Sequence, residues 1–347
     1  MNPHYLWTVI GAGPAGIAAV GKLLDHGIPE KQILWIDPLF RVGDFGTRWR
    51  NVSSNTKAGL FTKFLLECHA FDYQEQQKNF SLHTQDPHVT CELHHMATPL
   101  QWVSDHLKKR VTCVEALAEK LQIHQHYWEI TTPTKKYFSK HIVLAVGADP
   151  KSLSHPSVEE IALENVLDRK RISAVCSKDD KVAVFGSSHS GIMAVRHLLE
   201  HPVQQVINFY RSPLCYAVFF DDWILFDNTG LKGQTANWAR QAIDGEQPKH
   251  LRRYFSSDEN IQQYLPECNK VVYAIGFEKR CLPVIEGIGL VSYNDKNGII
   301  APGLFGFGIA YPESKTDRLG NVEYSVGLWK FMDYINRVLP VWMRYSI

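Results

Sequence analysis

The chain has 347 residues, with 37 Lys and Arg against 36 Asp and Glu. This length allows two domains with separate cores, and the near-neutral charge argues against a nucleic-acid or anionic-membrane partner. The seven cysteines stand at least thirteen positions apart. That spacing argues against a disulfide framework, a zinc ribbon and the paired thiols of a disulfide reductase.

The first segment predicts a strand, a glycine-rich turn, a helix and a second strand. Tyr5–Ile10 is a short apolar run, Pro14–His26 carries apolar residues at helical spacing, and Gln32–Asp37 is again apolar. Gly27 stands where a helix C-cap is expected. Two strands joined by one helix require a parallel crossover, so we expect a βαβ unit here.

The turn reads GAGPAG and matches the GxGxxG dinucleotide motif in its informative context. Gly11 permits the tight turn, Gly13 lets the backbone approach a pyrophosphate, and Gly16 lets helix and strand pack closely. An acidic residue ends the second strand, where it would bind ribose hydroxyls. The alternative is a glycine turn without a ligand. The contacts expected at this turn are Gly11, Gly13, Pro14, Ala15, Gly16, Asp37 and Pro38.

The pattern recurs at Lys181–Phe185, followed by GSSHSG, a helical stretch and the apolar run Gln205–Tyr210. We expect a second dinucleotide turn with Gly186, Ser188, Ser190 and Gly191, in which a serine replaces the middle glycine. Arg211 follows the second strand, where an arginine suits a 2′-phosphate and favours NADPH over NADH. The alternative is a structural domain that has lost its nucleotide.

Two further apolar runs end in glycine, at Gly147 and at Gly276, on either side of the second βαβ unit. They resemble the crossings between the FAD and NAD(P) domains of two-dinucleotide-fold proteins, which favours FAD at the first turn. We therefore predict an α/β protein with two Rossmann-like, three-layer domains, the NAD(P) domain inserted into the FAD domain. The predicted boundaries are 1–150 and 270–347 for FAD, and 151–269 for NAD(P).

The C-terminal part carries a third glycine-rich run and a final helix. Gly303–Ile309 occupies the place of the third FAD motif, with Gly308 as its last glycine, but Ile309 stands where that motif has an acid. The last helix is predicted from about Val322 to Val338. Asn321 would cap it and bring its N-terminus toward the flavin.

The segment Arg48–Lys57, RWRNVSSNTK, resembles the flavin-containing monooxygenases, a branch of the pyridine nucleotide-disulfide oxidoreductase superfamily. The resemblance implies FAD, NADPH with NADH as an alternative, and oxygenation of a small nucleophile or ketone through a C4a-hydroperoxyflavin. Asn55 would then be the catalytic residue that contacts the oxygen adduct; its alternative is a residue in a polar turn. The implied flavin contacts in this segment are Arg48, Trp49, Ser54 and Thr56. Of these, Ser54 and Thr56 could also hold the Asn55 amide in place.

The family's FxGxxxHxxx(Y/F) signature is missing near residues 152–178, where only His155 remains. Two other functions therefore stay open: an NAD(P)H oxidase or cysteine-independent flavin reductase, and a flavin-bound regulatory protein with an inactive nucleotide site. We expect no metal site. The expected partners are a small substrate and molecular oxygen, in a soluble cytoplasmic protein without signal peptide or membrane span, with a homodimer left open.

Overall fold

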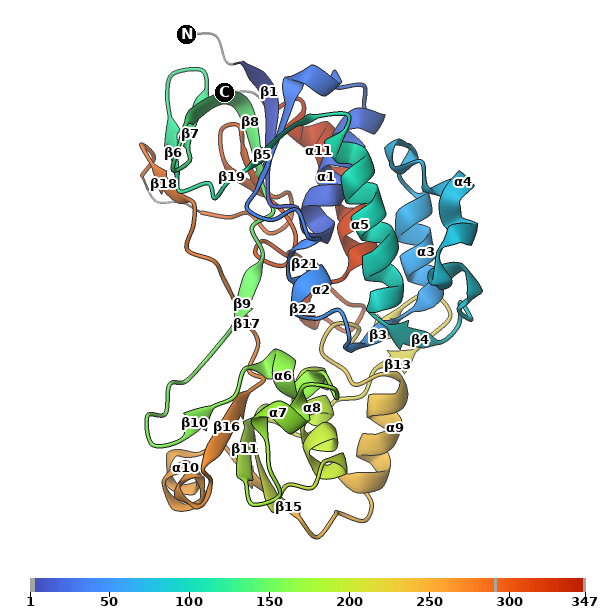
Figure 1. The fold of residues 1–347 in the computed structure, drawn as a ribbon, viewed down its shortest axis with the longest axis vertical. Helices are drawn as coiled ribbons and strands as arrows, with labels where there is room; N and C mark the ends of the chain where they lie inside the picture. Colours follow the sequence, from blue (N-terminus) through green and yellow to red (C-terminus); the bar gives the residue numbers. More distant parts are fainter. Residues whose placement is uncertain (1–3, 290–291, 346–347) are drawn as a thin grey trace. The chain divides into compact units, whose positions relative to one another are not determined.

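The computed structural model describes residues 4–289 and 292–345, which fall into two units (Figure 1). Residues up to Ala148, Lys279–Lys315 and those from Tyr324 onward form the first unit. The second unit consists of Asp149–Glu278 and the short stretch Thr316–Glu323. This short stretch lies within the range that the sequence assigned to the FAD domain.

The first unit has a mixed sheet with helices on one face. Four neighbouring strand pairs, β5–β2, β2–β1, β1–β8 and β8–β20, are parallel, and β6 and β7 extend β8 as an antiparallel meander. The elements that form this unit are β1 (Tyr5–Ile10), α1 (Pro14–Asp25), β2 (Ile33–Asp37), α2 (Gly43–Thr47), β3 (Ser53–Lys57), α3 (Ala58–Leu66), α4 (Tyr73–Gln76), β4 (Thr90–Glu92), α5 (His94–Lys108), β5 (Thr112–Glu115), β6 (Lys120–Ile123), β7 (Trp128–Thr131), β8 (Lys136–Leu144), β18 (Val284–Glu286), β19 (Ile299–Ala301), β20 (Leu304–Gly306) and α11 (Leu328–Trp342).

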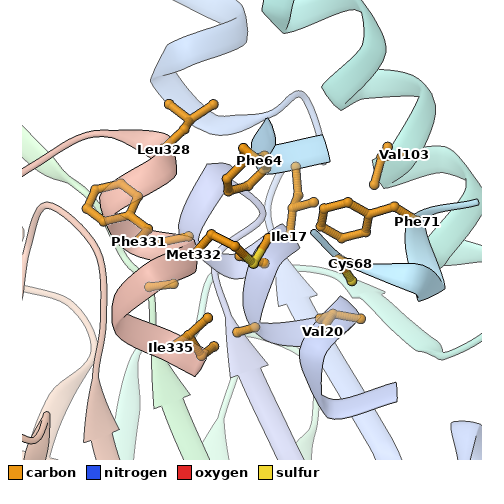
Figure 2. Packing of buried hydrophobic residues seen from close by; sticks show 14 of the residues in the cluster. Ile17, Val20, Phe64, Cys68, Phe71, Val103, Leu328, Phe331, Met332 and Ile335 are labelled. Atoms are coloured by element: carbon orange, nitrogen blue, oxygen red, sulfur yellow. The ribbon is translucent and has the colours of Figure 1, made fainter. Parts of the chain in front are cut away.

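Both faces of the parallel strands are buried, as expected for strands covered on two sides. On β2, Trp35 packs into the helix-side core, while Leu34 and Ile36 pack into a second core with the meander. Figure 2 shows the helix-side core, where α1 contributes Ile17 and Val20 and α11 contributes Met332. The unit therefore has the layer order of helices, parallel sheet and meander.

The second unit has a five-stranded sheet in the order β10-β16-β11-β12-β15, and every neighbouring pair in it is parallel. Helix α8 connects β11 to β12, which is the predicted second βαβ unit. The elements of this unit are β10 (Glu159–Glu160), α6 (Leu163–Leu167), α7 (Ile172–Val175), β11 (Lys181–Phe185), α8 (His189–Glu200), β12 (Gln205–Tyr210), β13 (Val218–Phe219), β14 (Ile224–Leu225), α9 (Gly233–Ala242), β15 (Leu251–Phe255), α10 (Asp258–Tyr264) and β16 (Lys270–Tyr273).

The chain passes between the units through β9 (Ala148–Pro150) and β17 (Phe277–Lys279), which pair with each other, and through the hairpin of β21 (Glu313–Thr316) and β22 (Val322–Ser325). The last helix was predicted to begin at about Val322, and this prediction is wrong. Helix α11 begins at Leu328, after Gly327 with a φ of 139°. Val322–Ser325 instead alternates exposed and buried residues, which is the period of a strand.

The strands and helices predicted at both glycine turns are confirmed, and the protein is of the α/β class with parallel sheets. Strand β1 and strand β12 have the predicted bounds, and Gly27 has the positive φ of a helix C-terminal glycine. Within the described ranges, the structure contains no helix long and apolar enough to cross a membrane.

Candidate functional site: two glycine turns

The first glycine turn is fixed by close backbone contacts. Gly11 has a φ of 108°, and a Cβ there would lie 2.2 Å from the carbonyl oxygen of Ala145 on the neighbouring crossing. A Cβ at Gly16 would lie 1.9 Å from the carbonyl oxygen of Gly11. Both positions therefore exclude side chains for reasons internal to the protein.

Gly13 differs from these two glycines because a Cβ there would meet no atom within 4 Å. Its φ of −75° and ψ of −179° are accessible to any residue, and it is the N-cap of α1, which begins at Pro14. The amides at the start of α1 thus face space that a pyrophosphate can approach, with the helix dipole favouring its charge. This geometry fits a dinucleotide.

The carboxylate of Asp37 closes the turn at the end of β2. One oxygen accepts the amide of Ala12 at 2.7 Å, and the other accepts the amides of Leu39 at 2.8 Å and Phe40 at 2.7 Å. Three donors do not exhaust the lone pairs of a carboxylate, so capacity for a ribose hydroxyl is left. The predicted ribose-binding acid is thus also the residue that ties the turn together, while Pro38 beside it is exposed.

Two other glycines lie against this turn. A Cβ on Gly43, the first residue of α2, would lie 3.1 Å from the Cα of Gly13. A Cβ on Gly308 would lie 2.6 Å from the Cβ of Ala15. The third glycine run therefore reaches α1, and Ile309, at the position of the missing acid, packs against the helix-side core.

Around α2 lies a charged group that the sequence analysis found only in part. Arg280 donates to Asp44 at 2.6 Å and to the carbonyl oxygen of Val146 at 3.3 Å, and its guanidinium borders Gly147. Asp44 also lies 4.0 Å from the predicted flavin contact Arg48, whose guanidinium is 5.5 Å from the Trp49 ring. The sequence signal that could have indicated this loop is the glycine at position 43, which adopts a positive φ in the structure; no local signal indicates Arg280.

The candidate catalytic residue Asn55 lies on the short strand β3, and its side chain is exposed. The Thr56 hydroxyl donates to the Asn55 side-chain oxygen at 3.3 Å, as expected. Ser54 does not hold the Asn55 amide, contrary to the expectation: its hydroxyl oxygen accepts the Thr56 amide at 2.7 Å. Asn55 is therefore oriented from one side and accessible from the other.

The second glycine turn repeats the backbone of the first. Gly186 has a φ of 115°, and a Cβ there would lie 2.2 Å from the carbonyl oxygen of Ala274. A Cβ on Gly191 would lie 2.5 Å from the carbonyl oxygen of Gly186. Ser188 has a φ of −80° and a ψ of −173°, close to the angles of Gly13. Serine therefore fits the middle position without backbone strain.

The start of α8 carries more side-chain chemistry than the start of α1. His189 and Ser190 are its first two residues, and the Nδ1 atom of His189 is buried without a hydrogen-bond partner among the described residues. Burial, and secondarily the charge of Lys232, lower the pKa of His189 to about 4. The ring is therefore neutral at pH 7. Arg211, the predicted 2′-phosphate residue, is exposed just after β12.

The structure also places three other residues that the sequence singled out: Asn321, Gly276 and His155. Asn321 does not cap a helix: it lies in the second unit, and its side-chain nitrogen donates to Asp317 at 2.7 Å. Gly276 has a φ of 101° at the crossing, as a strand-ending glycine allows. His155 shares a hydrogen bond of 2.6 Å with the Tyr273 hydroxyl and stacks on Phe185, so it is a packed residue of the second unit.

Comparisons with known proteins agree with this pair of turns. Residues 7–301 match the family model of pyridine nucleotide-disulphide oxidoreductases. The chain is 32% identical to the monooxygenase AgnR1 of Paecilomyces divaricatus, over 96% of this chain and 97% of that protein.

Solved structures share the fold at low identity. An L-lysine 6-monooxygenase from Pseudomonas syringae is 14% identical, with a TM-score of 0.66 over 99% of this chain and 100% of that one. The bacillithiol disulfide reductase of Staphylococcus aureus is 13% identical, with a TM-score of 0.61 over 99% of both chains. The same fold thus serves monooxygenases and reductases. From the family match and the near full-length relative, we conclude that the chain belongs to the pyridine nucleotide-disulphide oxidoreductase family and is an FAD-dependent oxidoreductase that also uses a nicotinamide nucleotide.

Proposed function

We propose that this protein is an NADPH-dependent flavin monooxygenase that inserts one oxygen atom into a small soft nucleophile or a ketone. The observation that carries the proposal is the 32% identity to a monooxygenase over nearly the whole chain. The cysteine spacing supports it, because no two cysteines stand close enough in sequence to form the CxxC or CxxxxC pair of a disulfide reductase.

Bound FAD would accept hydride from NADPH and pass electrons to molecular oxygen, so that one oxygen atom enters the substrate and the other leaves as water. The residues of this chain would bind and orient both nucleotides. In the first unit, the amides at the start of α1 and the Asp37 carboxylate would hold the adenosine diphosphate part of FAD. In the second, the start of α8 and Arg211 would hold NADPH.

Asn55 would act where oxygen reacts. A neutral amide offers a hydrogen-bond donor without a proton acidic enough to discharge the activated oxygen as peroxide. Its side-chain oxygen accepts from Thr56, which leaves the amide nitrogen to point elsewhere. This is the arrangement expected of a positioned donor, and Asn55 is exposed enough to reach a ligand.

The test is the fate of electrons from NADPH. We expect Asn55→Ala to bind FAD and oxidise NADPH as the wild type does. The ratio of hydrogen peroxide to oxygenated product should rise by about tenfold or more. The measurement is peroxide and product formed per NADPH oxidised, with a panel of thioethers and cyclic ketones as substrates. Ser53→Ala, an exposed change on the same strand, is the matched control and should behave as wild type.

Unchanged coupling in Asn55→Ala would remove Asn55 from the mechanism. A wild-type protein that converts all its NADPH into peroxide with every substrate would instead be an NAD(P)H oxidase. A flavin that neither NADPH nor NADH reduces under anaerobic conditions would indicate the regulatory alternative. The cytoplasmic location and the homodimer stay predictions.

A further inference from the structure

The two glycine turns can be aligned residue by residue through their hydrogen bonds. The amide of Gly11 donates to the carbonyl oxygen of Ile36 at 2.8 Å, and the amide of Gly186 donates to that of Phe209 at 2.9 Å. The residues that follow these acceptors are Asp37 and Tyr210. Tyr210 therefore stands where the first turn has its ribose-binding carboxylate.

A cation from the next strand accompanies Tyr210. Strand β15 lies parallel to β12 with Arg253 opposite Asn208, so both side chains share one face with Tyr210. The Arg253 Nε donates to the Asn208 side-chain oxygen at 2.9 Å, and its Cζ lies 4.7 Å from the Tyr210 ring centroid. The guanidinium is thus placed at the carboxyl end of β12.

Asn208 connects this guanidinium to the glycine turn itself. The Asn208 side-chain nitrogen donates to the carbonyl oxygens of Val184 at 3.0 Å and Gly186 at 2.8 Å. In the first unit, the Trp35 indole donates to the Gly11 carbonyl oxygen at 2.9 Å. The donor to the carbonyl oxygen of the first turn glycine is an indole in the first unit. In the second unit it is an amide that also accepts from a guanidinium.

Among the described residues, no carboxylate forms an ion pair with the Arg253 guanidinium. Its Nη2 is buried, and no described residue accepts a hydrogen bond from it. The acid that acts on it electrostatically, Asp244, already accepts the Tyr216 hydroxyl at 2.5 Å. Burial lowers the pKa of Arg253 from its ordinary value. A partly buried cation without a paired carboxylate costs free energy, which an anionic ligand can offset.

The next residue along the strand shows the contrast. Arg252 points to the other face of β15, where its two terminal nitrogens donate to Glu267 at 2.6 and 3.2 Å. Both terminal nitrogens of Arg252 are therefore paired with a carboxylate oxygen in a bidentate ion pair. Arg252 therefore serves as a matched control for Arg253.

We propose that Arg253 binds the 2′-phosphate of NADPH and, together with Arg211, sets the preference of the second unit for a phosphorylated nucleotide. The inference rests on the proposed use of NADPH. Relative to the first turn, the charge at the adenosine ribose is reversed: a carboxylate suits free hydroxyls, and a guanidinium suits a phosphate monoester, to which it donates charge-assisted hydrogen bonds.

The test compares adenosine 2′,5′-bisphosphate with adenosine 5′-monophosphate, which lacks the 2′-phosphate, by titration calorimetry on the FAD-loaded protein. The wild type should bind the bisphosphate more tightly. Arg253→Gln should weaken that binding by about 10- to 100-fold, the usual range for a lost hydrogen bond to a charged group. Binding of the monophosphate should change by less than about threefold, and Arg253→Lys should be intermediate because it keeps the charge. Arg252→Gln should bind both ligands as the wild type does.

Equal weakening of both ligands in Arg253→Gln would assign Arg253 a purely structural role and overturn the proposal. So would unchanged bisphosphate affinity in Arg253→Gln, or a wild type that does not distinguish the two ligands. If Arg253→Gln does not fold, Arg253→Lys and Arg253→Met take its place with the same criteria. The assay needs no turnover, so it can succeed even where the oxygen-coupling test of Asn55 fails.

Discussion

The two glycine turns have nearly the same backbone but different side chains around it. Gly11 and Gly186 each approach a carbonyl oxygen of the neighbouring crossing so closely that a Cβ would lie 2.2 Å away. In contrast, the middle position is Gly13 in one turn and Ser188 in the other, at almost the same φ and ψ. The outer glycines are therefore required by the fold, whereas the middle position is set by what the turn has to bind.

The same division appears at the helix starts. Helix α1 begins with Pro14, which supplies a fixed φ and no side-chain chemistry. Helix α8 begins with His189, whose ring is buried and neutral. If the first turn is a generic pyrophosphate site and the second is more selective, substitutions at equivalent positions should affect the two sites differently.

The largest effect is expected where a Cβ meets backbone. Gly16→Ala should destabilise the first unit by about 3 kcal/mol or more, because the Gly11 carbonyl lies 1.9 Å from the new atom and cannot rotate away. Gly191→Ala should do the same to the second unit. Urea unfolding of the apoprotein measures both changes.

Gly13→Ala is the matched control for Gly16→Ala. Its Cβ meets no protein atom within 4 Å, so the apoprotein should unfold at the wild-type urea concentration. FAD affinity should nevertheless fall by about tenfold or more, because the methyl group occupies space next to the pyrophosphate. Equal destabilisation by Gly13→Ala and Gly16→Ala would mean that the middle glycine is structural as well.

A smaller effect is expected from two histidines whose pKa is lowered to about 4 by burial, His141 in β8 of the first unit and His189 in α8 of the second. In the unfolded chain each histidine has a pKa of about 6.5, so between pH 4 and pH 6.5 the unfolded chain binds more protons than the folded protein. The contribution of each neutral histidine to stability is therefore present above pH 6.5 and is lost as the pH falls toward 4. For each histidine, the free energy of unfolding should fall by about 2 kcal/mol between pH 7 and pH 5.

Urea unfolding at the two pH values, followed by probes in each unit, tests this pH dependence. His141→Phe should reduce it in the first unit. His189→Gln should reduce it in the second unit, where burial also lowers the pKa of His197, so that part of the pH dependence remains. An undiminished pH dependence in the first unit of His141→Phe would assign the loss to other groups. In the second unit, bound NADPH should also reduce the loss of stability at pH 5 if its phosphates stabilise the protonated His189 ring.

The local parts of these turns were predictable from sequence, because they depend on periodicity and on glycine. Strand β1, helix α1 and strand β12 have almost the predicted bounds, since their apolar spacing and the turn glycines agree. The last helix was predicted too early because Val322–Ser325 is as apolar as a first helical turn. Val322–Ser325 pairs instead with β21 across the short turn 317–321, and helical spacing alone does not reveal this pairing.

The charged partners of the turns were not predictable for the same reason. Arg280 bonds to Asp44 from 236 positions away, and Arg253 bonds to Asn208 from 45 positions away. Neither arginine belongs to a motif, and only the sheet register brings Arg253 opposite Asn208. Motifs therefore indicate where a nucleotide is expected to bind, while the charged residues around each turn come from neighbouring strands and loops.

The smallest effect is expected from making the second turn resemble the first at its middle position. Ser188→Gly removes an exposed side chain at backbone angles that glycine also adopts, so stability should change by less than about 1 kcal/mol. If the serine Cβ only crowds the pyrophosphate, NADPH should bind a few times more tightly, with no change in the preference for the 2′-phosphate. If the serine hydroxyl instead holds the pyrophosphate, binding should weaken. Calorimetric titration of NADPH into Ser188→Gly and Ser188→Ala separates these outcomes. Ser188→Ala keeps the Cβ, so weaker binding by this variant can come only from loss of the hydroxyl. Tighter binding by Ser188→Gly than by Ser188→Ala can come only from loss of the Cβ.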